Sequence, residues 1–481
     1  MRIAIIGGGI AGLAAAYELE LACKSGQPVE YALFESGSRL GGVIASSIID
    51  GTVIERGPDS FLTEKPAAAQ LCRELGLGDQ LMPSNDAERR TYILVRNRLV
   101  PLPDGLMFLI PTKLAPTIFT GLFSIATKLR MGLELLQKPR ARDSASDESV
   151  ASLVRRHYGQ QAVDRLADPL LSGIYGGDAE ELSAASVLPR LVEMEAKHGS
   201  LTRGMLAGLR ARRAASEGNA PPAPPVFTTL RRGLQTMIDA LVAKIDAASL
   251  LLETPVGAIQ PLAGGEGWRV FSAGVVQAFD AVIVATPAWA AAEMLRSADA
   301  ALSAELSGIP YSSSVTVNLV YSGSDLDPLP PGFGFLVPAV ERRAILACTF
   351  IHRKFVGRSA PGKTVLRTFL GGAHNAHLLE QTDDEIEAIV RRELFQLLSI
   401  SAEPELVEVQ RWPRAMAQYA VGHRGRMQRI QARLADLPGL RLVGNAYDGI
   451  GISDCIRLGR KAATDLMTTL RDRPATAQSH R

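Results

Sequence analysis

The chain has 481 residues, and a usual domain length of about 150 residues predicts two to four structural units. Hydrophobic residues make up 47% and charged residues 21%, which excludes a disordered chain, a fibrous repeat and a polytopic membrane protein. A net charge of +2 and 5% aromatic residues argue against a nucleic-acid partner. Four separated cysteines, with no Cys/His cluster, predict no metal site, no disulfides and a reducing, cytoplasmic location.

The chain opens with a predicted dinucleotide-binding unit. An apolar strand at 3–6, a helix at 13–21 and a second strand at 29–34 form one βαβ unit around a glycine-rich turn. Glu35 ends the second strand, 23 residues beyond Gly12, where a carboxylate can bind ribose hydroxyls.

The glycine turn explains how such a unit holds a pyrophosphate. In Gly-x-Gly-x-x-Gly, Gly7 makes the turn, Gly9 lets the backbone approach the phosphates, and Gly12 lets helix and strand pack closely. Ile10 and Ala11 open the helix, whose N-terminus faces the anion. The turn by itself leaves open whether the dinucleotide is NAD or FAD.

The next stretch favours FAD. Arg39-Leu40-Gly41-Gly42 brings a second glycine pair, Gly41 and Gly42, and a cation, Arg39, to the same pyrophosphate. This pattern resembles the two-glycine signature of the flavin amine oxidase superfamily. The resemblance implies that a backbone valine touches the adenine; Val256 matches, although a plain strand end explains that residue equally well.

Further elements follow along the chain. Residues 66–80 and 149–170 read as helical, 92–100 as a hairpin, and the Pro-rich stretch 211–225 as a linker. Later segments are predicted as strands at 281–285, 315–321, 334–337, 345–350, 365–370 and 440–443, and as helices at 383–398 and 454–470.

The far end of the chain agrees with a flavin site. A strand ends at Gly444, and Asp448-Gly449-Ile450-Gly451-Ile452 leads into the last helix. In the superfamily such a helix points its N-terminus at the flavin, where its dipole stabilises negative charge on the reduced ring. The cofactor residues expected here are Gly444, Gly449, Ile450, Gly451 and Ile452.

Four motifs resemble a narrower family, the oxygen-dependent protoporphyrinogen/coproporphyrinogen oxidases of haem biosynthesis. They are Gly57-Pro58-Asp59-Ser60-Phe61, the stretch Asp168–Asp178, Gly332–Pro338 and Gly444–Gly451. The resemblance runs from residue 3 to about 468. It implies a FAD enzyme that removes six electrons from a porphyrinogen while O2 becomes H2O2.

The resemblance also implies substrate contacts. Phe369 matches a ring-stacking phenylalanine, Leu336 an apolar residue on the opposite wall, and Gly173 a position whose backbone carbonyls lie near the reacting carbon. Arg90 is the expected propionate partner, with Arg89 as the alternative register. No residue stands out as a catalytic base, which fits chemistry carried by the cofactor.

The predicted fold is α/β (α+β), with a Rossmann-like FAD domain of the amine oxidase type. That domain is expected to be discontinuous, formed by 1–84, 226–300 and 410–470, with a helical insertion at 85–210, a mixed-sheet substrate domain at 301–409 and a tail at 471–481. The rival functions are another amine oxidase or desaturase, and a non-catalytic binding protein such as a prenyl-protein chaperone. The choice between coproporphyrinogen III and protoporphyrinogen IX stays open, as does that between monomer and homodimer.

The insertion contains a segment expected to rest on a membrane. Residues 89–140 carry nine Lys/Arg and two Asp/Glu, a local net charge of +7, which suits an anionic leaflet. A single helical stripe is predicted, with Phe108, Phe119 and Phe123 adding apolar surface; it comprises Ile118, Leu122, Ile125, Leu129, Leu133 and Leu136. Residues 104–137 are therefore predicted to lie on the inner face of the cell membrane without crossing it. The alternative is that the stripe packs on the protein's own core.

Overall fold

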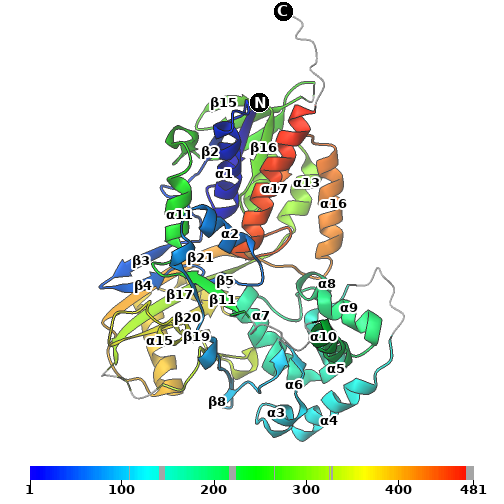
Figure 1. Ribbon diagram of the computed structural model, residues 1–481, viewed down its shortest axis with the longest axis vertical. Helices are drawn as coiled ribbons and strands as arrows, with labels where there is room; N and C mark the ends of the chain where they lie inside the picture. The colour runs from blue at the N-terminus through cyan, green and yellow to red at the C-terminus, as the bar shows by residue number, and fades with distance from the viewer. Residues whose placement is uncertain are drawn as a thin grey trace, which may run out of the picture.

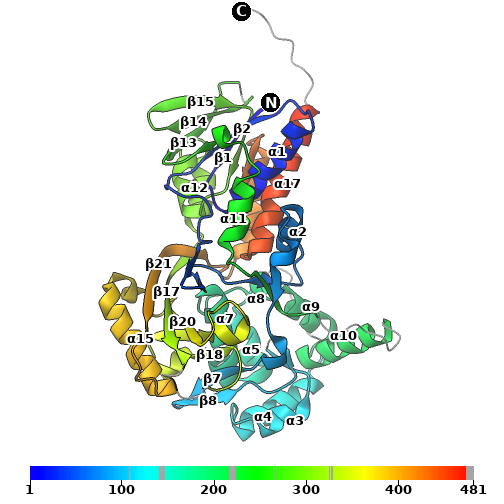
Figure 2. The same ribbon diagram turned by 60° about the vertical axis from the view of Figure 1, so that its left-hand side comes forward.

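The structure is a computed structural model, which describes residues 1–107, 109–139, 147–215, 224–264, 266–323, 326 and 329–472. Figure 1 and Figure 2 show an upper lobe, which contains the N-terminus and the last helix, above a wider lower lobe. In Figure 1 the lower lobe has a sheet with one long helix on the left and a group of helices on the right.

A five-stranded parallel sheet forms the centre of the upper lobe. In spatial order its strands are β12 (Leu250–Leu251), β2 (Glu30–Phe34), β1 (Arg2–Ile6), β16 (Ala281–Val284) and β22 (Leu440–Leu442). Every residue of β16 is buried, as expected for a parallel strand that is covered on both faces. Three distant parts of the chain thus build one sheet.

Both faces of this sheet are covered. One face packs against α1 (Ile10–Lys24), α11 (Gln235–Val242) and α17 (Ile452–Arg471), with α2 (Ala67–Glu74) beside them. The other face packs against α12 (Ala288–Leu295), α13 (Ala300–Ser307), α16 (His423–Ala435) and the antiparallel sheet of β13 (Val256–Pro261), β14 (Trp268–Ser272) and β15 (Val275–Phe279).

A seven-stranded sheet forms the left half of the lower lobe. Its order is β21 (Leu406–Ala417), β17 (Tyr311–Ser322), β20 (Lys363–Gly371), β19 (Ile345–Phe350), β18 (Gly334–Leu336), β7 (Thr91–Val95) and β8 (Arg98–Pro101). All neighbours are antiparallel except β18 and β7. The helix α15 (Asp383–Leu398) packs on one face, which leaves the other face for the site described below.

Helices form the right half of the lower lobe. They are α3 (Leu114–Phe119), α4 (Ile125–Leu133), α5 (Val150–Tyr158), α6 (Gln160–Ala162), α7 (Asp168–Tyr175), α8 (Ala184–Val187), α9 (Pro189–His198) and α10 (Leu201–Ala215). Shorter elements join the two lobes or extend loops: β3 (Ser46–Ile49), β4 (Thr52–Glu55), β5 (Phe61–Leu62), β6 (Leu81–Pro83), β9 (Leu106–Met107), β10 (Ile110–Pro111), β11 (Phe227–Leu230) and α14 (Ile351–Lys354).

The first βαβ unit and the hairpin at 92–100 are confirmed. The helix α1 begins at Ile10, three residues earlier than predicted, because Gly9 is its extended N-cap residue. The hairpin turns at Arg96 and Asn97, both with positive φ, as a tight two-residue turn requires.

Three predicted elements end or extend elsewhere. The helix expected to reach residue 80 stops at Glu74, and the helix expected over 149–170 breaks after Tyr158 at Gly159, whose φ is 89°. The long strand β21 was not predicted. The domain limit placed between residues 409 and 410 therefore falls inside one strand.

The prediction of one apolar helical stripe over 118–136 is wrong. The segment forms α3 and α4, separated by a loop that ends at Ser124, whose hydroxyl caps α4 by accepting from Thr127 N. Leu122 and Phe123, in that loop, are buried. Phe108 lies outside the described residues.

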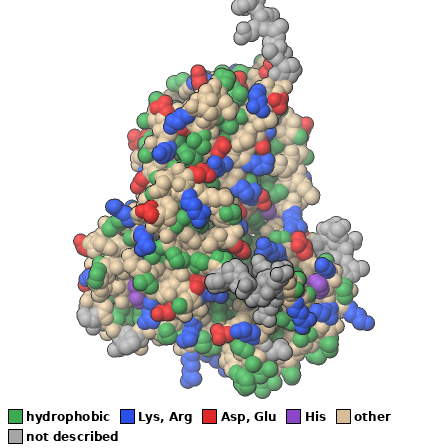
Figure 3. Space-filling view, in the orientation of Figure 1, with side chains coloured by type: hydrophobic (Ala, Val, Ile, Leu, Met, Phe, Trp, Pro, Cys, Tyr) green, Lys and Arg blue, Asp and Glu red, His purple; other side chains and the backbone are tan. Residues whose placement is uncertain are grey.

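Most of the predicted apolar side chains in this segment are nevertheless exposed. We call the exposed set the apolar patch; it comprises Ile118, Phe119, Ile125, Leu129, Leu133 and Leu136. Phe119 is 85% exposed and Leu129 64% exposed. Figure 3 shows hydrophobic side chains gathered at the bottom of the molecule, where Figure 1 places α3 and α4, with basic side chains nearby. None of the described helices is long and apolar enough to cross a bilayer.

Candidate active site

The first glycine turn leaves its backbone open at one position and packs tightly at another. A methyl group added at Gly9 would meet nothing within 4 Å. One added at Gly12 would overlap the carbonyl oxygen of Gly7, so this glycine is needed for the packing of α1 on β1. Ile10 and Ala11 follow as the buried first residues of α1, whose free N–H groups suit an anion.

The second glycine pair lies directly against the first turn. Gly41 N donates to Gly8 O at 2.8 Å, and a methyl group at Gly42 would come within 3.2 Å of Gly9 Cα. Gly41 and Gly42 have φ of 105° and 59°, so other residues would be strained there. The two turns form one side-chain-free cradle, which fits a pyrophosphate.

Arg39 holds this loop in shape. Its guanidinium donates to the carbonyl oxygens of Leu40, Ile44 and Gly42. These hydrogen bonds hold the backbone of the second glycine turn in place. The predicted contact between Arg39 and the pyrophosphate stays a prediction.

Glu35 joins the first glycine turn to the segment that leads into β13. Its carboxylate accepts from Gly8 N and from Gly37 N, both at 2.7 Å. Thr254 N donates to Glu35 O at 2.8 Å, which brings the segment leading to Val256 beside the end of β2. Val256 is the first residue of β13 and is half-buried.

The C-terminal glycine loop meets the first turn through α17. Gly451 is the N-cap of α17, and the carboxylate of Asp454 accepts from Gly451 N and from Lys65 Nζ. Gly459, about two turns further along α17, packs against the backbone of Ala11 in α1. The start of α1 is thus held close to the first turns of α17.

The loop before α17 is braced by a buried tyrosine. Tyr419 Oη accepts from Gly449 N and donates to Asn445 O. Gly444 and Gly449 have φ of 128° and 102°, conformations that glycine adopts without strain. Ile450 is half-buried and Ile452 is the buried first residue of α17.

The predicted substrate residues Leu336, Phe369 and Gly173 come together at the free face of the lower sheet. Leu336, Ala347 and Phe369 are paired directly across β18, β19 and β20, so their side chains share one face. Leu336 and Phe369 therefore lie about 10 Å apart, at two strand spacings. They flank the small Ala347 on one sheet face, and their role as the two walls of a substrate slot stays a prediction.

Gly173 completes this group. It lies in α7, and a methyl group at Gly173 would come within 3.2 Å of Leu336 Cδ2. The turn that ends α7 is fixed to the sheet, since Ser312 Oγ and Gln418 Nε2 both donate to Tyr175 O. Gly173 itself is exposed, so its backbone is open to a ligand on this face.

The two candidate arginines lie at the other end of β18. Arg90 O accepts a hydrogen bond from Phe333 N, and Arg90 lies one residue before β7. Along the strand it is about 10 Å from the position on β7 that pairs with Leu336. Both arginines are exposed. Arg89 lies 3.6 Å from Asp86, whereas Arg90 has no ion pair among the described residues.

A cluster of charged, mostly buried side chains lies at the same face of the sheet. The sequence did not indicate this cluster. It comprises Glu55, Asp59, Lys354, Arg358 and Arg367. Burial raises the pKa of Asp59, but the charges of Lys354 and Arg367 outweigh it and hold that pKa well below its usual range. Its members are up to about 300 residues apart in sequence, so no local pattern could have revealed the cluster.

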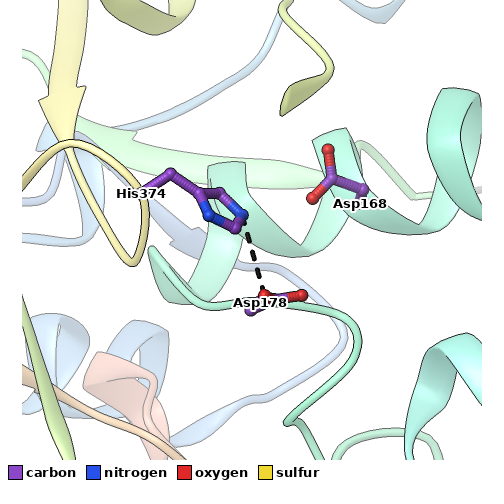
Figure 4. Close-up of side chains that lie close together, drawn as sticks. All are labelled: Asp168, Asp178 and His374. Atoms are coloured by element: carbon purple, nitrogen blue, oxygen red, sulfur yellow. Dashed lines mark ion pairs between the residues drawn. The ribbon is translucent and has the colours of Figure 1, made fainter. Parts of the chain in front are cut away.

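A second group of titratable side chains lies at the ends of α7. Asp168, Asp178 and His374 place possible ligand atoms within 4.8 Å of one another, and His374 Nε2 is 3.8 Å from Asp178 Oδ2 (Figure 4). Asp168 accepts from Ala339 N at 2.8 Å, and burial raises its pKa. The sequence predicts no metal here, and the group links α7 to the loop after β20.

Comparison with known proteins identifies the family. Residues 10–467 match the family model described as flavin containing amine oxidoreductase. The chain belongs to this family. It is therefore a flavin-dependent oxidoreductase with the α/β fold predicted from its sequence, and FAD is the cofactor that its two glycine turns fit.

Named relatives cover nearly the whole chain. A protein of Bacillus subtilis (strain 168) named coproporphyrinogen III oxidase is 36% identical over 98% of both chains. A protein of Propionibacterium freudenreichii with the same name is 34% identical, over 97% of this chain and 90% of that protein. Chloroplastic protoporphyrinogen oxidase 1 of Spinacia oleracea is 28% identical, over 97% of this chain and 84% of that protein.

Solved structures agree. A protein from Exiguobacterium sp. 255-15, provisionally named a protoporphyrinogen oxidase, superposes with a TM-score of 0.84 at 32% identity, covering 97% of this chain and 99% of that one. Cyclohexylamine oxidase from Brevibacterium oxydans IH-35A has a TM-score of 0.68 at 18% identity, covering 98% and 99%, which shows a shared fold.

Proposed function

We propose that this protein oxidises a porphyrinogen to the porphyrin in haem biosynthesis, with FAD as hydride acceptor and O2 as final oxidant. The preferred substrate in this proposal is coproporphyrinogen III. The observation that carries it is the 36% identity to a coproporphyrinogen III oxidase over 98% of both chains, which includes the sheet and α7 of the lower lobe.

The arrangement of the lower lobe supports a flat, apolar substrate. Leu336 and Phe369 flank Ala347 on a sheet face, and a ring stacked on Phe369 would lie beside the open backbone of Gly173. Bound FAD supplies the acceptor for the hydride that leaves the macrocycle. The chain's own residues would hold the ring and offer backbone carbonyls near Gly173.

The carboxylates of the substrate need cations at the rim. Arg90 is exposed and has no ion pair among the described residues, so it is available to a propionate. Arg89 is the alternative, at the cost of its contact with Asp86. Coproporphyrinogen III has two more propionates than protoporphyrinogen IX and so gains more from such a contact.

Anaerobic flavin reduction tests the proposal. The FAD-loaded protein is mixed under nitrogen with coproporphyrinogen III, protoporphyrinogen IX or a primary amine, and flavin absorbance is followed. We expect bleaching by the porphyrinogens, return of colour with H2O2 on admission of air, and a higher kcat/KM for coproporphyrinogen III. Bleaching by the amine alone would identify an amine oxidase, and no bleaching would identify a binding protein.

We further propose that the apolar patch rests on the inner face of the cell membrane. Phe119 and Leu129 are exposed on α3 and α4, which lie at the bottom of the lower lobe (Figure 1), and Lys113, Arg130 and Lys138 of the same stretch of chain are exposed as well. Exposed apolar residues with basic neighbours suit an anionic leaflet. Such a surface would also receive a substrate of low solubility.

Liposome co-flotation tests this surface. Fully burying a phenylalanine or leucine is worth roughly 1.5–3 kcal/mol, so Phe119→Ser with Leu129→Ser should weaken binding to anionic vesicles by about 2–4 kcal/mol. The matched control is Val275→Ser with Val276→Ser, two exposed apolar residues of β15 at the opposite end of the molecule. Equal flotation of both double variants, or none by the wild type at low salt, would refute the proposal.

A further inference from the structure

The buried charge cluster carries one more cation than its acids neutralise. Lys354 Nζ pairs with Asp59 Oδ2 at 2.9 Å, and Arg358 pairs with Glu55. Arg367 is left as the third cation against these two carboxylates. Its Nη1 lies 3.9 Å from Asp59 Oδ2, too far for a tight ion pair.

Arg367 is also incompletely hydrogen-bonded. Its Nη2 donates to Gly57 O, whereas its Nε is buried and has no hydrogen-bond partner among the described residues. The residue is only 2% exposed, so water does not compensate. The adjacent pair of Arg56 and Glu408 is balanced in charge within itself. A buried, partly unpaired guanidinium destabilises a protein unless something else uses its charge.

The position of Arg367 joins the cofactor turns to the substrate face. It precedes Phe369 by two residues on β20, so both side chains lie on one sheet face, and its Cζ is 4.9 Å from the ring centre of Phe369. Its partner Gly57 packs so closely on Val43 that a methyl group there would overlap Val43 O. Val43 directly follows the second glycine pair.

The same frame reaches the third part of the cofactor site. The segment after Gly57 continues to Lys65, which accepts at its carbonyl from Ser453 Oγ and pairs with Asp454 at the start of α17. Arg367 therefore stands where the segments expected to hold the flavin meet the strand expected to hold the substrate.

We propose that Arg367 is the cation that stabilises negative charge developing on dioxygen as reduced flavin is reoxidised. This inference rests on the proposed oxidase function. Two electrons and one proton for O2 would come from bound FAD in its anionic reduced form and one further proton from solvent, so that the products would be oxidised FAD and H2O2. A fixed positive charge in a site closed to water lowers the cost of the first electron transfer, because no solvent has to reorganise around the new anion.

Reoxidation without any porphyrinogen tests Arg367 directly. The FAD-loaded protein is photoreduced under nitrogen and mixed with oxygenated buffer, and the second-order rate constant is read from flavin absorbance. Arg367→Gln should lower it at least tenfold, while Arg367→Lys should stay within about threefold of wild type. Lys363→Gln is the matched control, because Lys363 is the half-buried first residue of the same strand and is paired with Glu405.

Two further measurements fix the interpretation. The midpoint potential of bound FAD should fall in Arg367→Gln, because the reduced flavin carries more negative charge and loses a stabilising cation. A lower potential makes the flavin a stronger reductant. Slower reoxidation in this variant would therefore show that the cation stabilises the charge on oxygen. Asp59→Asn removes a neighbouring carboxylate and should raise the rate at least threefold. It decides the question if Arg367→Gln fails to fold or to hold FAD.

The outcomes separate the two proposals. If the wild-type reduced flavin reacts with O2 only slowly, the oxidase function fails. If the wild-type reduced flavin reacts fast with O2, two results would overturn the role of Arg367 while leaving the oxidase function intact. These are an equally fast reaction in Arg367→Gln and an unchanged midpoint potential of FAD in that variant. An unchanged or lower rate in Asp59→Asn also overturns it.

Discussion

Two glycines of the first turn should respond to the same substitution in opposite ways. A methyl group at Gly9 meets no atom within 4 Å, and the residue has φ of −71° and ψ of 175°, a conformation that alanine adopts freely. Gly9→Ala should therefore leave the apoprotein intact, and should stabilise it by about 0.4–1 kcal/mol through the lower entropy of the unfolded chain.

The cost of Gly9→Ala should fall on the cofactor. The methyl group would stand in the open space beside the turn, where the backbone must approach the pyrophosphate. A displacement that lengthens two or three charge-assisted hydrogen bonds costs about 2–4 kcal/mol, which is roughly a 30- to 1000-fold loss of FAD affinity.

Gly12→Ala provides the contrast. Its methyl group would overlap Gly7 O, so α1 must move away from β1, at a cost of about 1–3 kcal/mol in the apoprotein as well. Urea unfolding of both apoproteins and FAD titration by flavin fluorescence measure the two effects. Wild-type FAD affinity in Gly9→Ala would refute the cradle, and wild-type stability in Gly12→Ala would refute the packing argument.

Three other predictions concern the lower lobe. Phe369→Ala should lower kcat/KM for the porphyrinogen by about 2–4 kcal/mol, while Phe395→Ala, an exposed residue of α15, should not; equal effects would return Phe369 to a core role. Arg90→Ala should raise KM more for coproporphyrinogen III than for protoporphyrinogen IX, and equal increases would move the propionate contact elsewhere. Burial opposes charge on His157, but hydrogen bonds to Glu134 and Glu195 outweigh it and raise its pKa. The resulting stability is full below the ordinary pKa of about 6.5 and is lost as pH rises through the raised value. Melting temperatures from pH 6 to 9 should therefore fall in the wild type and stay flatter in His157→Gln.

The sequence by itself determined the cofactor half of this protein. Gly7, Gly9 and Gly12 lie in one short turn, and its tightest contact, that of a methyl group at Gly12 with Gly7 O, is made within that turn. Contacts between residues close in the chain leave a recognisable spacing of glycines in the amino-acid sequence. The βαβ unit and the last helix are therefore found close to where the residues predict them, as is the hairpin of the lower lobe.

Only the tertiary structure decided how the substrate half is assembled. Leu336 and Phe369 share one sheet face because β19 lies between their strands, a pairing that no single segment encodes. Arg367 meets Gly57 and Asp59 from more than 300 residues away, so its excess charge is invisible in sequence. The apolar patch was recognisable by composition, but which of its side chains face solvent depended on the loop at 120–124 and on the helices packed behind it.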